Sequence, residues 1–472
     1  MNQVKPAPIS AFLRALSLWG RLNTTIRIAS LLPLLVSLQC SGIKDQPDPR
    51  PFEAVENDLF LRGDLHRFYA KLEKLQKEKK GVIRVLFFGD SVIWGDCLTV
   101  RLKRDFQRDF GDGGRGLLRL VDWAPTRLMD HTNLTRGGFE RHKIPFESFD
   151  VPPFPDLGFT GFSHRPQSGG STTIQQVGPR TPIYDVRRYQ SNQRNHSSLP
   201  AIPDTGPPKG ARFGTDGESW KRVHLILRPG DAREAKAELR YRTEEGTTGV
   251  DTGSVRFSTS GCQSLKFSIP ASRRIDLSFE GRPFIDGLAV ETGGGISFSS
   301  IVMRGLHQAW LLGIPEEQFA CGYRAYDPDL VIFQFGINES QTMHYAVQGF
   351  SPEIYERQLR DLYGRIQRAV PGASILILGP WERLLKQNGM YQTYEAHARV
   401  REIQKRVAND MGLAYFDGFI YLEGTEGLRR AVRRGLIQGD YTHTSYPGGH
   451  YMADALYNRI MEDFAVWKES RR

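Results

Sequence analysis

Cysteine is scarce in this chain of 472 residues, which has only four: Cys40, Cys97, Cys262 and Cys321. The last three lie far apart, so their spacing indicates neither a metal site nor a disulfide framework, and we expect them to be small buried residues. The chain also lacks a recognisable nucleic-acid-binding motif, although its formal net charge is +10. That charge therefore favours anionic membrane surfaces or acidic cell-wall polymers as partners over nucleic acid.

The composition is that of a globular protein, with 39% hydrophobic and 25% charged residues. The length exceeds what one ordinary core supports, so two or three domains are expected.

The N-terminal region predicts export. Several basic residues precede an apolar stretch, Ile28 to Leu38, which is too short to span a bilayer but suits the core of a signal peptide. Cys40 follows it and precedes a tether rich in Pro and Asp, as in a bacterial lipoprotein. We expect residues 1–40 to be a signal or lipoprotein segment with Cys40 as the lipidation site, and residues 41–54 to be a linker.

The rest of the chain predicts one α/β domain interrupted by a β domain. Buried-strand patterns at 82–88, 329–335, 374–378 and 413–416 alternate with helical patterns, which indicates a three-layer α/β/α fold with a parallel sheet. Between them, short alternating strands separated by turns are typical of an antiparallel β-sandwich or jelly roll. The expected parts are 55–111 and 291–472 for the α/β domain and 112–290 for the insert.

The stretch Val82 to Leu98 carries the first candidate site residue. A buried strand ends at Gly89-Asp90-Ser91, and helical spacing follows. Ser91 is therefore expected at the carboxyl edge of the sheet, where open α/β folds keep their active sites. A cap on the helix by Asp90 or Ser91 explains the same residues equally well. A nearby G-x-G-x-x-G run, Gly111 to Gly116, follows a helix instead of a strand, so we interpret it as a loop and not as a nucleotide site.

Partners for a serine nucleophile occur far along the chain. Asn338 follows the second strand and can point to the same sheet edge as Ser91. Asp440 and His443 stand three residues apart ahead of the last helix, a spacing that lets the carboxylate orient the imidazole. The spacing of Asp440, His443 and His450 also allows a metal site, but no further ligand cluster supports it.

Together these segments resemble the SGNH (GDSL) hydrolase superfamily. Its blocks correspond to Gly89-Asp90-Ser91-Val92, Gly336-Ile337-Asn338-Glu339 and Asp440-Tyr441-Thr442-His443, with Val92 and Glu339 as departures. The block that supplies an oxyanion glycine fits Ser300 to Leu306 best, which gives Gly305, with Gly295 as the rival. The resemblance implies that Ser91 is the nucleophile, His443 the base and Asp440 its orienting acid. Ser91, Gly305 and Asn338 would form the oxyanion hole.

The long β-rich insertion is similar to the arrangement in bacterial peptidoglycan O-acetylesterases. The resemblance thus implies an acetylesterase of the cell envelope or periplasm that acts on an acetylated glycan without a metal or organic cofactor. An O-acetyltransferase, a lipase or arylesterase, and a non-catalytic glycan-binding lipoprotein remain alternatives.

Overall fold

The computed structural model describes residues 60–61, 65–94, 96–120, 131–136, 138–145, 153–167, 170–176, 218–231, 233–257 and 261–471. The predicted signal segment, Cys40 and the linker at 41–54 lie outside these residues. Within the described ranges, no helix has the length and apolar character needed to cross a membrane.

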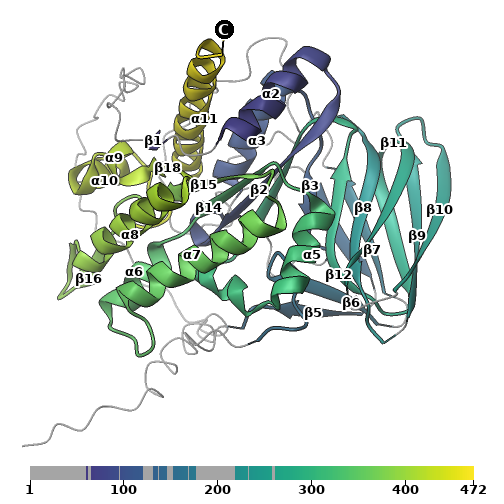
Figure 1. Ribbon diagram of the computed structural model, residues 1–472, viewed down its shortest axis with the longest axis horizontal. Coiled ribbons are helices and arrows are strands. Elements are labelled where there is room, and N and C mark those ends of the chain that lie inside the picture. Colours follow the sequence, from purple (N-terminus) through teal and green to yellow (C-terminus); the bar gives the residue numbers. More distant parts are fainter. Residues whose placement is uncertain are drawn as a thin grey trace, which may run out of the picture. The chain divides into compact units, whose positions relative to one another are not determined.

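A six-stranded sheet forms the centre of the α/β part (Figure 1). Its order is β1-β18-β15-β14-β2-β13, and every pair is parallel except β1 with β18. The strands are β1 (Phe60–Leu61), β2 (Gly81–Gly89), β13 (Gly294–Val302), β14 (Leu330–Gln334), β15 (Ser374–Gly379) and β18 (Ala414–Asp417). The four strands expected from the sequence are confirmed, and β1 and β13 are additional ones.

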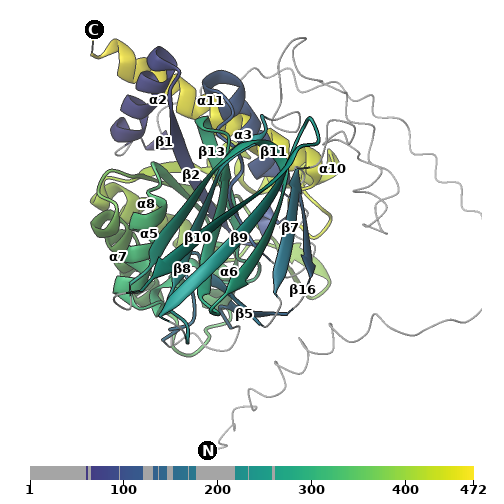
Figure 2. The same cartoon turned by 90° about the vertical axis from the view of Figure 1, so that its right-hand side faces the viewer.

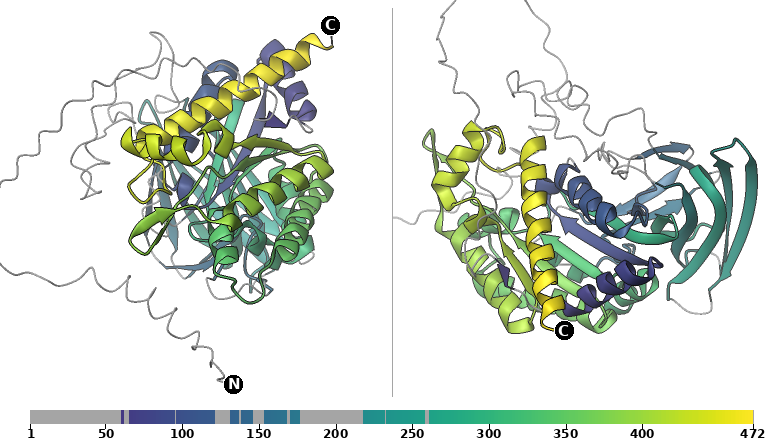
Figure 3. Two further views of the ribbon diagram at one scale, coloured as in Figure 1. Left: turned by 90° about the vertical axis from the view of Figure 1, so that its left-hand side faces the viewer. Right: turned by 90° about the horizontal axis from the view of Figure 1, so that it is seen from above.

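Helices cover both faces of this sheet, as the view from above shows (Figure 3). One group comprises α2 (His66–Glu78), α3 (Cys97–Phe110) and α11 (Tyr446–Glu469). The other comprises α5 (Glu316–Tyr326), α6 (Ile337–His344), α7 (Pro352–Ala369) and α8 (Glu395–Met411). Two short helices, α9 (Gly418–Tyr421) and α10 (Gly424–Arg433), follow β18, and a small hairpin pairs β16 (Leu385–Gln387) with β17 (Met390–Gln392). The predicted three-layer α/β/α architecture is confirmed.

Helix α7 shows how local sequence sets these elements. Ser351 accepts a hydrogen bond from the N–H of Ile354 at 3.2 Å, and Pro352 occupies the first turn, where its missing N–H costs nothing. Its apolar stripe is buried at Tyr355, Leu359, Leu362, Tyr363, Ile366 and Ala369. The stripe joins a core cluster with alternate residues of the sheet, such as Phe88 and Phe333, whose rings stack at 5.2 Å.

The inserted β domain is an antiparallel sandwich organised by one long strand (Figure 2). The strands are β3 (Gly116–Leu118), β4 (His131–Arg136), β5 (Phe139–Lys143), β6 (Phe162–Pro166), β7 (Ser171–Gln176), β8 (Trp220–Arg228), β9 (Glu234–Thr243), β10 (Thr248–Arg256), β11 (Gln263–Glu280) and β12 (Phe284–Glu291). The first half of β11 pairs with β8, and its second half pairs with β9 and β7. Strand β11 is therefore part of both layers of the sandwich. Inward-facing residues such as Leu225, Leu239 and Leu277 form the core between them.

Two glycine runs lie together where the chain enters and leaves the insert. Ile296 donates a hydrogen bond to the carbonyl of Gly111 at 2.9 Å, and Gly113 donates to the carbonyl of Ile296 at 3.0 Å. A Cβ on Gly295, whose φ is +100°, would lie 2.3 Å from the oxygen of Gly111. The G-x-G-x-x-G run thus permits two backbones to approach closely, which accounts for its glycines without a nucleotide.

The strand β13 faces the insert with polar groups. Ser299 accepts the N–H of Leu117 in β3 at 2.9 Å and bonds the hydroxyl of Tyr326 at 2.7 Å. Because the buried Ser297 and Ser299 alternate with apolar residues, the strand lacks the continuous apolar run that identified the others. Arg84, the one charge in β2, forms a bidentate pair with Glu291 at the end of β12. The contacts of Ser299 with Leu117 and of Arg84 with Glu291 therefore join the two domains.

A disulfide bond between Cys262 and Cys321 also links the insert to the α/β domain, because Cys262 precedes β11 and Cys321 lies on α5. Their Cα atoms are 5.8 Å apart, although 59 positions separate them in the sequence. The expectation that these cysteines are unpaired small residues was therefore wrong. Sequence spacing carried no signal, since the pair forms only after the domains pack.

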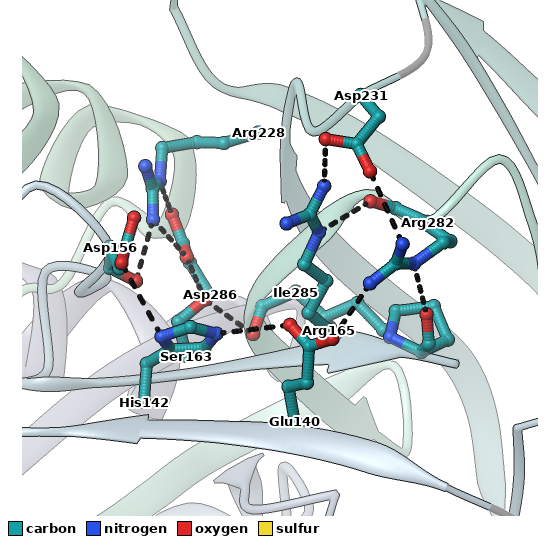
Figure 4. Close-up of polar contacts among 11 residues, drawn as sticks. Glu140, His142, Asp156, Ser163, Arg165, Arg228, Asp231, Arg282, Ile285 and Asp286 are labelled. Atoms are coloured by element: carbon teal, nitrogen blue, oxygen red, sulfur yellow. Dashed lines mark hydrogen bonds and ion pairs between the residues drawn. The ribbon is translucent and has the colours of Figure 1, made fainter.

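One end of the insert is held by a network of charged side chains (Figure 4). Buried Arg228 pairs with Asp286 and also donates to the carbonyls of Pro155 and Asp156 at 3.1 and 3.2 Å. Arg282 reaches Glu140 at 2.7 Å, so the network fixes the 153–167 segment and β5 against β8 and β12. These acids and bases are neutralised within the network and serve the fold.

Candidate active site

Asp90 caps the turn that follows β2, and this leaves the hydroxyl of Ser91 available. Its carboxylate accepts the N–H of Val92 at 2.8 Å and is fully buried, while its own N–H bonds the carbonyl of Gln334 in β14. The turn is a short 3-10 helix, η1 (Ser91–Ile93), and α3 begins only at Cys97. The capping explanation of this turn therefore applies to Asp90 and not to Ser91.

Ser91, His443 and Asp440 form a continuous chain of hydrogen bonds. Ser91 Oγ lies 2.7 Å from His443 Nε2, although 352 positions separate the two residues. His443 Nδ1 lies 2.6 Å from Asp440 Oδ2, and Asp440 Oδ1 accepts the backbone N–H groups of Thr442 and His443 at 3.0 Å each. A proton on Nδ1 leaves Nε2 able to accept the proton of Ser91, which is the arrangement that nucleophilic catalysis requires.

The electrostatic surroundings keep Asp440 ionised. Partial burial alone would raise the pKa of Asp440, but the hydrogen bond and charge of His443 and the two backbone N–H groups hold that pKa below its usual value. An ionised Asp440 stabilises the imidazolium that forms when His443 takes a proton.

The segment that carries His443 is fastened to the nucleophile turn. Thr444 donates its hydroxyl to the carbonyl of Val92 at 3.2 Å, and Gln438 N donates to the carbonyl of His443 at 2.8 Å. Ser445 then caps α11 through the N–H of Gly448. The loop is thus held at both ends, so the imidazole is positioned before substrate arrives.

Gly305 and Asn338 lie together beside the nucleophile turn. Met303 donates to the carbonyl of Gly89 at 2.7 Å, and Leu306 donates back to Met303, which encloses Gly305 in a turn with φ +73°. Asn338 Nδ2 donates to the carbonyl of Leu306 at 3.2 Å. An amide has two N–H groups, so the second remains available to a ligand.

The rival glycine, Gly295, lies at the opposite edge of the sheet. It pairs with Val82 near the start of β2, whereas Val302 at the other end of β13 pairs with Gly89. Seven residues of strand at 3.3 Å each separate these levels, which is roughly 23 Å. Gly295 is therefore too far from Ser91 to donate to the same oxyanion.

Glu339 holds the turn that presents Asn338. Its carboxylate accepts the N–H groups of Gly336 at 2.9 Å and Gln308 at 3.1 Å in a fully buried position. Burial raises the pKa of Glu339 to about 8, and the nearby Asp90 carboxylate contributes to the rise. Burial likewise raises the pKa of Asp90 to about 6, despite the opposing N–H of Val92 and charges of His443 and Arg383.

Two site residues escaped the sequence analysis: Trp381 and Arg383, in the loop after β15. Trp381 Nε1 donates to the carbonyl of Thr442 at 3.2 Å. Arg383 donates to the carbonyl of Ile337 and to the hydroxyl of Thr442, both at 3.1 Å, so it bridges the segments of Asn338 and His443. Their position after the carboxyl end of a predicted parallel strand was the available signal.

Metal-binding geometry is not found in the part of the chain that the structure describes, where no group of three or more His, Cys, Asp or Glu could hold an ion. His450 belongs to α11, where burial together with the charges of Arg101 and Arg104 lowers its pKa to about 3.

Comparison with known proteins agrees with this geometry. Residues 300–445 match the model of the GDSL-like lipase/acylhydrolase family, a range that contains Gly305, Asn338, Asp440 and His443 but not Ser91. No curated protein sequence matches the chain.

Among solved structures, a peptidoglycan O-acetylesterase is similar over 86% of this chain and 99% of its own, with 20% identity and a TM-score of 0.64. An acetylxylan esterase from Geobacillus stearothermophilus matches 35% of this chain and 73% of its own at 18% identity, with a TM-score of 0.27. A family two carbohydrate esterase from Clostridium thermocellum matches 53% and 91% at 12% identity, with a TM-score of 0.25. The first match shows that the α/β domain and its insert form a known fold.

The family match and the fold comparison both include the α/β domain. Strand β2 and the turn of Ser91 also belong to this domain, because β2 pairs with β14. Residues 300–445 therefore match a GDSL-like lipase/acylhydrolase domain, and the chain is a carboxylic ester hydrolase.

Proposed function

We propose that the chain removes O-acetyl groups from a cell-envelope polysaccharide such as peptidoglycan. The observation that carries this proposal is the hydrogen-bond chain from Ser91 through His443 to Asp440. Similarity of both the α/β domain and the insert to a peptidoglycan O-acetylesterase supports the choice of substrate.

In the proposed mechanism Ser91 Oγ attacks the acetyl carbonyl while His443 Nε2 takes its proton. His443 then gives this proton to the departing sugar oxygen, which leaves acetyl-Ser91. Water, deprotonated by the same nitrogen, attacks the acetyl-enzyme and releases acetate. Through both steps the N–H groups of Ser91 and Gly305 and the second N–H of Asn338 would stabilise the oxyanion, each donor contributing about 3–4 kcal/mol.

Export to the cell envelope forms part of the proposal. The disulfide between Cys262 and Cys321 supports an oxidising compartment, since such bonds rarely persist in a reducing cytosol. We also propose that Cys40 is the lipidation site. Radiolabelled palmitate should enter the wild type and not Cys40→Ala, and equal labelling of both would exclude the anchor.

An acetate-release panel tests the substrate, with Ser91→Ala as the blank. We expect acetate from O-acetylated peptidoglycan, less from acetylated xylan, and little cleavage of long-chain lipid esters. Preference for long acyl chains would favour a lipase, and products acetylated on an added acceptor glycan would indicate a transferase.

Ser91→Ala tests the mechanism separately, on 4-nitrophenyl acetate. Its kcat should fall by about 10⁴-fold or more, because removal of a serine nucleophile leaves only binding and the oxyanion donors. A fluorophosphonate should label wild-type Ser91. Full activity of the variant would exclude the mechanism, and absence of labelling would favour a glycan-binding protein.

A further inference from the structure

Arg304 is an exposed cation next to Gly305, the candidate oxyanion glycine. Its guanidinium carbon lies over the ring of Trp94, 4.4 Å from the ring centre, and Trp94 is half-buried. Arginine stacks well on tryptophan because the indole face is electron-rich and the planar guanidinium is weakly hydrated.

Both residues are fixed close to the reacting atoms. The backbone N–H of Trp94 donates to the carbonyl of Ser91 at 3.2 Å. Arg304 stands one residue before Gly305 in the turn that Met303 ties to Gly89 and Leu306 ties to Asn338. The backbone on either side of the pair thus belongs to the nucleophile turn and the proposed oxyanion hole.

Within the described part of the chain, no carboxylate pairs with Arg304. Other surface arginines of the α/β domain do have such partners: Arg368 lies 2.7 Å from Glu316, and Arg399 lies 2.9 Å from Glu395. The carboxylates of the site already have other partners. Asp440 bonds His443, and the buried Asp90 and Glu339 accept hydrogen bonds from backbone N–H groups. The guanidinium therefore keeps donors for an incoming anion.

We propose that Arg304, stacked on Trp94, is a specificity-determining residue that binds a carboxylate of the substrate, so that the enzyme selects acetyl esters on an anionic glycan. This inference rests on the proposed deacetylase function and names the chemical class of its substrate. A guanidinium suits the role because two parallel N–H groups match the two oxygens of a carboxylate.

The test compares anionic substrates with neutralised versions of them. O-acetylated peptidoglycan fragments are used with free carboxylates and after conversion of these to methylamides, and 4-acetoxybenzoate is compared with its methyl ester. The proteins are the wild type, Arg304→Gln, Arg304→Lys and the control Arg324→Gln, which removes an exposed arginine of α5 paired with Glu317. The measurement is kcat/KM for acetate release.

The wild type and Arg324→Gln should prefer each free carboxylate over its neutral version by about tenfold or more, as expected for a hydrogen-bonded charge. Arg304→Gln should lose this preference, and Arg304→Lys should recover only part of it, because an ammonium lacks the planar pair of donors. The wild-type preference should also decrease when salt is raised from 50 to 500 mM.

Equal wild-type rates on the free and neutralised substrates would overturn the proposal. So would an equal loss for Arg304→Gln on all substrates, because this would mean that Arg304 only supports the Gly305 turn. If the wild type cleaves the aryl esters but neither polymer, the polysaccharide proposal fails, and discrimination between 4-acetoxybenzoate and its methyl ester still decides the role of Arg304.

Discussion

Replacement of Asn338 by alanine provides the sharpest test of the proposed oxyanion hole. The amide has one N–H bonded to the carbonyl of Leu306 at 3.2 Å and a second available to substrate. Removal of one such donor typically lowers kcat by 10²–10³, or about 2.7–4 kcal/mol. The lost bond to Leu306 also loosens the turn that holds Gly305, so we expect the upper part of this range.

The assay is steady-state hydrolysis of 4-nitrophenyl acetate, with KM expected to change little because the donor acts mainly on the transition state. Asn338→Asp should be at least as damaging, since a carboxylate cannot donate and repels the oxyanion. Asn409→Ala is the matched control, because Asn409 is exposed near the end of α8 that leads to the start of β18.

Circular dichroism should show that all three variants remain folded. A loss of kcat smaller than tenfold in folded Asn338→Ala would refute the assignment of Asn338 to the oxyanion hole.

Two further predictions concern stability. Because burial raises the pKa of Glu339 to about 8 from an ordinary value of 4.5, the unfolded chain binds fewer protons between these values, and stability should fall as pH rises. This pH dependence is at most about 1.4 kcal/mol per pH unit. The free energy of unfolding, measured in urea at pH 6 and pH 8.5, should differ less between the two pH values for Glu339→Gln than for the wild type. An equal difference in both proteins would contradict the role of Glu339. The double variant Cys262→Ser/Cys321→Ser should lose up to about 4 kcal/mol of stability, as expected for opening a loop of this length, while hydrolysis of 4-nitrophenyl acetate persists. In a strong reductant the free energy of unfolding of the wild type should fall to that of the double variant. An unchanged unfolding midpoint would show that the disulfide does not stabilise the fold.

The insert explains why the family match begins only at residue 300. The strand and turn that carry Ser91 precede the β domain, and the remaining strands of the sheet follow it. Pairing of β2 with both β13 and β14 restores the sheet, so a nucleophile outside the matched range meets its partners inside it.

The amino-acid sequence was enough to predict the α/β class, the interrupting β domain and the four candidate side chains Ser91, Asn338, Asp440 and His443. The fold class and the insert could be predicted because their signals are local: apolar runs that end in tight turns, and alternation along strands. Each signal depends on neighbours along the chain. The four side chains were selected by the resemblance of their blocks to the SGNH superfamily, because each residue by itself also suits a cap or a surface loop.

The folded structure was needed to show which glycine lies beside Ser91, how two cysteines pair, and what Trp381, Arg383 and Arg304 contact. Gly295 and Gly305 both suit the sequence, and only the parallel register of β13 on β2 separates them by the length of a strand. The disulfide and the stacking of Arg304 on Trp94 join segments distant in the sequence. Such contacts leave no periodicity in the chain, because they depend on which surfaces meet after the sheet and its insert have packed.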